Sequence, residues 1–183
     1  MASLLAGATK TAHSLATSLL SAAEAKVGST IPLKVPVKED DAQKTFTFEG
    51  VLKGKNVFVG VPGAFTGTCS AQVPGYIKAF DKFKEKGVEN VYIVAVNDVF
   101  VMKAWKEQLA PEGTPAGVHF IADDQGAFVG ALGMLFDASP LLGAPRSKRF
   151  VAVTEGETIT YIAVEPNPAE LTVTAAEKVL PWL

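Results

Sequence analysis

Residues 56–76 read NVFVGVPGAFTGTCSAQVPGY, and this stretch decides how the chain folds. The first six residues, NVFVGV, are nearly all apolar, which predicts a buried strand. A turn rich in Gly, Pro and Thr follows over residues 62–68 and leads to Cys69. Apolar residues then recur with helical spacing, at Val73, Tyr76, Ile77, Phe80 and Phe83. The stretch therefore predicts a strand, a tight turn and a helix whose first turn holds Cys69.

The same alternation of strands and helices continues along the chain. Further strands are expected at 44–48, 91–96, 118–121, 150–154 and 158–164. Further helices are expected at 97–109, at 127–132, and after a capping-box pattern over 174–177. This order predicts an α/β protein with a central, mixed but mostly parallel sheet and helices on both faces. Ligand sites in such sheets lie at the carboxyl ends of strands, which is where Cys69 is expected.

The N-terminal segment differs in composition from the remainder. Residues 1–26 are rich in Ala, Ser, Thr and Leu and contain no arginine, although transit peptides favour arginine. We interpret them as an N-terminal helical extension, with a cleaved leader as the alternative, and residues 27–183 as one domain. The C-terminal Pro-Trp-Leu is not the peroxisomal Ser-Lys-Leu signal. A cytoplasmic location is the default expectation, and a mitochondrial one is the alternative.

Composition excludes several classes of function. The 183 residues carry a formal net charge of −2 with both signs interspersed, which favours neither nucleic acid nor an acidic membrane surface as partner. No apolar run approaches the roughly 20 residues that span a bilayer. One cysteine rules out an internal disulfide, and with two histidines it gives too few ligands for a zinc site built from Cys and His. The sequence predicts neither a metal nor a cofactor.

Cys69 is the candidate nucleophile. The pKa of a free cysteine thiol is about 8.5, so only about 3% is the reactive thiolate at pH 7. A helix N-terminus favours the thiolate through its unpaired N–H groups and partial positive charge. The segment PRSKRF adds three candidate cations, Arg146, Lys148 and Arg149. The alternatives are a cysteine that is only a small buried apolar residue, cations that form a solvated patch, and threonines that only cap the helix.

The segment VPGAFTGTCSAQVPGY (61–76) resembles the active-site segment of the type II, or atypical, peroxiredoxins. That family carries Pro-x-x-x-Thr-x-x-Cys, here Pro62, Thr66 and Cys69. The resemblance continues over 83–105, 120–128 and 141–153. It implies a thioredoxin-like fold, reduction of hydrogen peroxide and alkyl hydroperoxides, and a homodimer.

The resemblance also implies roles for individual residues. Cys69 is the peroxidatic cysteine and is oxidised to a sulfenic acid. Thr66 hydrogen-bonds the peroxide and the thiolate, Pro62 shields the sulfur from water, and Arg149 stabilises the thiolate and the polarised O–O bond. The expected substrate pocket is formed by Phe65, Gly67, Thr68 and Leu142.

The sequence departs from this family in two ways. Val173 stands where some relatives carry a resolving cysteine, so an external thiol (thioredoxin, glutaredoxin or glutathione) has to reduce the sulfenic acid. The stretch after Cys69 is one residue shorter than the usual Cys-Ser-x-x-His-Val-Pro and lacks its histidine, which is expected to shift the following helix. A peroxide sensor or redox-signalling binding module on the same fold is the alternative function. A thioredoxin-type oxidoreductase is disfavoured, because the chain has no Cys-x-x-Cys.

Overall fold

A five-stranded mixed sheet forms the centre of the computed structural model, which describes residues 22–183. Its strands are β1 (Lys55–Val61), β2 (Val88–Ala95), β3 (Val118–Ala122), β6 (Phe150–Glu155) and β7 (Thr158–Val164). They lie in the order β3-β2-β1-β6-β7. The pairs β1–β2 and β2–β3 are parallel, whereas β6 is antiparallel to both β1 and β7. Four strands therefore share one direction, and β6 alone runs against them.

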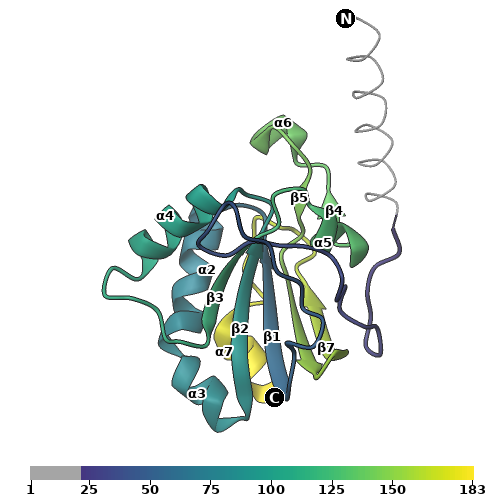
Figure 1. Cartoon of the computed structure of the whole chain (residues 1–183), viewed down its shortest axis with the longest axis vertical. Coiled ribbons are helices and arrows are strands. Elements are labelled where there is room, and N and C mark those ends of the chain that lie inside the picture. The colour runs from purple at the N-terminus through teal and green to yellow at the C-terminus, as the bar shows by residue number, and fades with distance from the viewer. Residues whose placement is uncertain (1–21) are drawn as a thin grey trace, which may run out of the picture.

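Helices surround the sheet, and a small hairpin stands at one end of it (Figure 1). The helices are α2 (Gly67–Lys78), α3 (Phe80–Glu85), α4 (Val99–Leu109), α5 (Ala127–Ala131), α6 (Ser139–Leu142), α7 (Ala176–Val179) and the 3-10 turn η1 (Leu180–Trp182). The hairpin pairs β4 (Leu135–Phe136) with β5 (Arg146–Ser147), and α6 lies between them in sequence. None of the helices in residues 22–183 is long and apolar enough to cross a membrane.

The sheet separates two apolar cores. Alternate residues of β1 point to opposite faces, as the pleat of a strand requires. Val57, Val59 and Val61 pack with α2, α3, α4 and α7 on one face. Phe58 packs on the other face with α5 and the loops before β1, where the ring centroids of Phe48 and Phe58 are 5.2 Å apart. Both faces of β1 are therefore dry, which explains why its sequence is apolar throughout rather than alternating.

Two local predictions from the sequence are wrong. Residues 44–48 form no strand, because only an isolated bridge joins Phe46 to Val37, and the TFTF alternation instead packs Phe48 in the core. The pattern over 174–177 is not a capping box. Helix α7 begins at Ala176 without a side-chain cap, because the Thr174 hydroxyl hydrogen-bonds the buried Glu165 carboxylate instead.

The helix expected after Cys69 is divided into α2 and α3. The two meet at Ala79, whose N–H donates to carbonyls of α2, and the apolar spacing continues across the junction into Phe80 and Phe83. Helix α4 begins as predicted, because the Asp98 carboxylate accepts a hydrogen bond from the Val101 N–H. Most of the helical extension expected over residues 1–26 lies outside the described residues, and residues 22–26 contain no helix.

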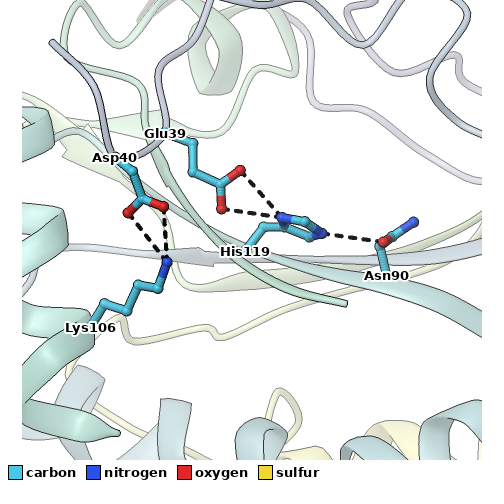
Figure 2. Close-up of polar contacts among 5 residues, drawn as sticks. All are labelled: Glu39, Asp40, Asn90, Lys106 and His119. Carbon is cyan, nitrogen blue, oxygen red and sulfur yellow. Dashed lines mark hydrogen bonds and ion pairs between the residues drawn. The ribbon is translucent and has the colours of Figure 1, made fainter. Parts of the chain in front are cut away.

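A short segment before β1, residues 37–41, is fastened to the far edge of the sheet (Figure 2). The Glu39 carboxylate lies 3.1 Å from Nδ1 of His119, and Nε2 of His119 lies 3.2 Å from Oδ1 of Asn90. Lys106 donates to both carboxylate oxygens of Asp40. We call Glu39, His119 and Asn90 the strap cluster, since they connect this segment to β3 and β2.

Candidate active site

Cys69 lies in the first turn of α2, directly after the turn that leaves β1. Its side chain is completely buried. The first N–H groups of a helix have no intrahelical partner, so they present partial positive charge to groups near this turn. Phe65 takes a left-handed backbone conformation (φ 64°) in the turn and leaves 48% of its surface exposed.

One guanidinium reaches the sulfur. Nη2 of Arg149 lies 3.4 Å from Sγ of Cys69. Arg149 precedes β6 and is itself only 1% exposed. Its Nη1 donates to Oε1 of Gln72 (2.6 Å), and its Nε and Nη2 donate to the Pro168 carbonyl (2.9 and 2.8 Å). The cation is therefore held in place by two neutral acceptors and directed at the sulfur.

The other two candidate cations are engaged elsewhere. Arg146 donates to the carbonyls of Val96 and Leu142. Lys148 forms an ion pair with Glu24. Of the three cations that the sequence offered, the structure brings Arg149 alone into contact with Cys69.

The two threonines of the turn do not cap the helix with their side chains. Thr66 occupies the N-cap position of α2, but its hydroxyl donates to the Gly63 carbonyl at 3.0 Å. The Thr68 hydroxyl donates to the Ala169 carbonyl at 2.9 Å and so ties α2 to a distant loop. Capping is therefore not the role of either hydroxyl.

A cavity of about 380 Å³ lies beside this turn. Its walls include six residues expected at the site and further apolar side chains of the 136–142 segment: Pro62, Thr66, Gly67, Thr68, Leu142, Arg149, Phe136, Ala138, Pro140 and Leu141. Phe65 was expected in the pocket but does not line it, because the left-handed backbone turns its side chain toward solvent.

The groups that hold Arg149 in position were not predicted from the sequence. Gln72 is 2% exposed, and Glu165 is 4% exposed. Burial raises the pKa of Glu165, but hydrogen bonds from Thr172 and from the backbone of 172–174 outweigh it and lower this pKa to about 2. Gln72 stands one turn after Cys69 on the apolar face of α2, and a polar residue at that position is the one feature of the sequence that could have indicated its role. Nothing in the local sequence singles out Glu165.

No metal site competes with this interpretation within residues 22–183, where no group of three His, Cys, Asp or Glu residues is placed to hold an ion. The site consists of a buried thiol, a guanidinium, backbone dipoles and an apolar cavity. Such a site can stabilise negative charge that moves from sulfur to a leaving oxygen.

Comparisons with known proteins agree with the geometry. The family model described as Redoxin matches residues 26–180. The chain is 47% identical over 154 residues to "Peroxisomal membrane associated protein 20" of Schizosaccharomyces pombe, covering 84% of this chain and 96% of that protein.

Two solved structures share the fold. Reduced Prx3 of Vibrio vulnificus in complex with hydrogen peroxide is 34% identical with a TM-score of 0.76, over 86% of this chain and 99% of that chain. Peroxiredoxin 5 of Alvinella pompejana is 35% identical with a TM-score of 0.74, over 85% and 96%. The thioredoxin-like fold is thereby confirmed. The chain belongs to the Redoxin family and is an enzyme of its atypical, one-cysteine peroxiredoxin type.

Proposed function

We propose that this enzyme reduces hydrogen peroxide and alkyl hydroperoxides through a sulfenic acid on Cys69. The observation that carries the proposal is the 3.4 Å contact between Sγ of Cys69 and the buried Arg149 guanidinium at the first turn of α2. A cation and peptide dipoles that converge on one sulfur stabilise negative charge there, and the thiolate is the form of a cysteine that attacks peroxides.

The proposed reaction has two stages. The Cys69 thiolate attacks one peroxide oxygen, so that an S–O bond forms and the O–O bond breaks. The electron pair moves to the distal oxygen, which takes up a proton and leaves as water or an alcohol, and Cys69 is left as the sulfenic acid. An external thiol then attacks that sulfur and releases water, and a second thiol frees Cys69 as the other two sulfurs form a disulfide.

The neighbouring residues fit supporting roles in this reaction. Arg149 is placed to stabilise both the thiolate and the charge that develops on the leaving oxygen. Thr66 lines the cavity, and its hydroxyl oxygen keeps acceptor capacity for a peroxide O–H while it donates to the Gly63 carbonyl. Pro62 lines the same wall, and its ring limits the access of water to the site.

The apolar lining of the cavity supports alkyl hydroperoxides as substrates beside hydrogen peroxide. The side chains of Phe136, Pro140 and Leu142 offer contacts to an alkyl chain. A volume of about 380 Å³ exceeds what hydrogen peroxide fills and is within the range of small-molecule sites. The second-order rate constants for hydrogen peroxide and for cumene hydroperoxide test this preference.

The reductant has to come from outside the chain, because Cys69 is its single cysteine. We propose thioredoxin, glutaredoxin or glutathione, and parallel turnover assays with each distinguish them. We also propose a homodimer, supported by two exposed apolar side chains: Leu141 at the cavity is 87% exposed, and Phe65 in the turn before α2 is 48% exposed. Analytical ultracentrifugation tests the dimer. A cytoplasmic location, with the mitochondrion as alternative, stays a prediction for imaging of the tagged full chain.

The decisive test of the peroxidase is Cys69→Ser, which removes the nucleophile. Peroxide consumption is expected to stop while circular dichroism and the unfolding midpoint stay close to those of the wild type. A folded Cys69→Ser protein with full activity would contradict the proposal.

Complete burial of the sulfur favours a second candidate function, a peroxide sensor, because a buried sulfenic acid is hard for a protein reductant to reach. Stopped-flow oxidation of Cys69 separates the two functions. A rate constant far above that of free cysteine, with turnover by an added thiol, supports the enzyme. A rate constant close to that of free cysteine supports the sensor.

A further inference from the structure

Both acceptors that hold the Arg149 side chain depend on one stretch of chain, residues 165–174, which we call the 165–174 loop. The Pro168 carbonyl in this loop accepts two hydrogen bonds from the guanidinium. The other acceptor, Gln72, is fixed by the same loop, since its Nε2 donates to both the carbonyl and the hydroxyl of Thr174 at 2.9 Å. The position of Arg149 therefore depends on the conformation of this loop.

One carboxylate at the start of the loop fixes its end. Glu165 accepts five hydrogen bonds: from N–H and Oγ1–H of Thr172 (2.8 and 2.6 Å), from N–H of Val173 (2.8 Å), and from N–H and Oγ1–H of Thr174 (2.8 and 2.9 Å). Glu165 takes part in none of the ion pairs found among residues 22–183. The loop itself thus supplies the groups that compensate this buried charge.

A buried carboxylate is costly unless its oxygens are hydrogen-bonded. Conformations of the loop that withdraw the donors of 172–174 are therefore disfavoured as long as Glu165 is ionised. The Glu165 N–H also donates to the Arg149 carbonyl at 2.9 Å, so the carboxylate is anchored beside the residue whose side chain it helps to place. The hydrogen bonds run from Glu165 through Thr174 and Gln72 to Arg149, and neighbouring bonds share a residue. A change at Glu165 is therefore transmitted to the guanidinium.

We propose that Glu165 is a positioning residue for the peroxidase site, because its carboxylate folds the 165–174 loop into the shape that presents Pro168 and Thr174, and through Thr174 the amide of Gln72, to the Arg149 guanidinium. This inference deepens the proposed function and depends on it for its catalytic meaning. Glu165 touches neither the sulfur nor the cavity that adjoins it, and it acts through Arg149.

The test compares Glu165→Gln with Glu157→Gln, a matched change at an exposed carboxylate in the turn between β6 and β7. The second-order rate constant of Cys69 oxidation by hydrogen peroxide is measured by stopped flow in the full chain. Glu165→Gln is expected to lower it about tenfold, less than the loss of a directly contacting donor, and Glu157→Gln is expected to leave it unchanged. A folded Glu165→Gln protein that reacts at the wild-type rate would overturn the proposal.

A double-mutant cycle with Arg149→Lys separates positioning from general stability. If Glu165 acts through the guanidinium, Glu165→Gln is expected to cost about twofold or less once Arg149 is already lysine. An equal loss in both backgrounds would overturn the proposal. If Glu165→Gln does not fold, Thr172→Val replaces it, because this variant removes one of the five donors to Glu165. It is expected to slow Cys69 oxidation less than Glu165→Gln, and the loss should again shrink when Arg149 is already lysine.

The same variants are also treated with iodoacetamide, whose reaction with Cys69 requires a thiolate but no peroxidase activity. If the wild type reacts with peroxide no faster than free cysteine, the proposed function fails. The positioning inference is then decided by alkylation alone. The inference is supported if Glu165→Gln slows alkylation of Cys69 and this loss nearly disappears when Arg149 is already lysine. It is overturned if alkylation is unchanged, or if the loss is equal in both backgrounds.

Discussion

Two polar clusters join loops to the sheet of this protein, and they do so under different conditions. The first, which we call the buried cluster, consists of Arg149, Gln72, Glu165 and the 165–174 loop. Its Arg149 and Glu165 are 1% and 4% exposed. In the strap cluster, the side chains of His119 and Glu39 are 26% and 24% exposed. Figure 2 shows the second cluster, in which Glu39 and Asn90 lie on either side of the His119 ring. Both contain a carboxylate, but Glu165 is the central acceptor of its cluster, whereas Glu39 stands at one end, beside His119.

The difference shows how burial changes the value of similar contacts. Water competes for the groups of the strap cluster and screens their charges, so each contact contributes little. In the buried cluster every acceptor must be matched, because an unmatched group there is costly. Fixed charges in such a dry site also act more strongly on a reacting atom. We therefore expect changes in the buried cluster to affect both activity and stability, and changes in the strap cluster to affect stability slightly.

The largest effect is expected for Arg149→Met, which keeps most of the side-chain volume but removes the charge beside the sulfur. Oxidation of Cys69 should slow roughly 100- to 1000-fold, or about 3–4 kcal/mol of activation free energy. Arg149→Lys is the control, since it keeps the charge but not the planar fork. Its rate of Cys69 oxidation should lie between those of the wild type and Arg149→Met. Stopped-flow oxidation measures both variants. A Met variant as fast as the wild type would remove Arg149 from the mechanism.

The next effect is the acid sensitivity of the buried cluster. The pKa of Glu165 is lowered from the ordinary 4.5 to about 2, so its ionised form stabilises the fold. That contribution, about 3 kcal/mol, should be complete above pH 4.5 and be lost as the pH falls toward 2. Urea unfolding of wild type and Glu165→Gln from pH 7 down to pH 2 checks this. The gap between the two should close in that window, and a constant gap would contradict the shift.

A smaller effect is expected for Tyr76→Phe. The Tyr76 hydroxyl donates to the Thr174 carbonyl at 2.6 Å, and burial raises the pKa of Tyr76, so the hydroxyl stays protonated. Its loss should cost about 1 kcal/mol of unfolding free energy. The Gln72 amide still donates to the same carbonyl, so the rate of Cys69 oxidation should fall no more than about twofold. A loss near that of Glu165→Gln would instead place Tyr76 among the positioning residues.

The smallest effect is expected in the strap cluster. His119→Ala removes the contacts to Glu39 and Asn90, and the Tyr92 ring loses its stacked partner. Because these groups are partly solvated, the cost should be about 0.5 to 1 kcal/mol in urea unfolding. The rate of Cys69 oxidation should not change. A variant with slowed oxidation would show that the two clusters are coupled, which would break the contrast between them.

Much of the fold could be predicted from residue patterns, and the errors have physical causes. The strand at 56–61 and the helix whose first turn holds Cys69 are found where apolar runs and spacing indicate them. Alternation over 44–48 was misleading, because a loop that buries Phe48 in the core produces the same pattern as a strand. The Thr174 pattern failed since a buried carboxylate competes for the hydroxyl more strongly than a helix end does.

The sequence by itself determined the candidate nucleophile and its local setting. A strand, a turn and a helix start are encoded by neighbouring residues, so they place Cys69 among the free N–H groups of α2. Only the tertiary structure decided which cation serves it, because Arg146, Lys148 and Arg149 look alike in the sequence, and hydrogen bonds from distant segments separate them. The role of Glu165 was likewise invisible, since the environment of a buried charge is made by chain folding and not by its sequence neighbours.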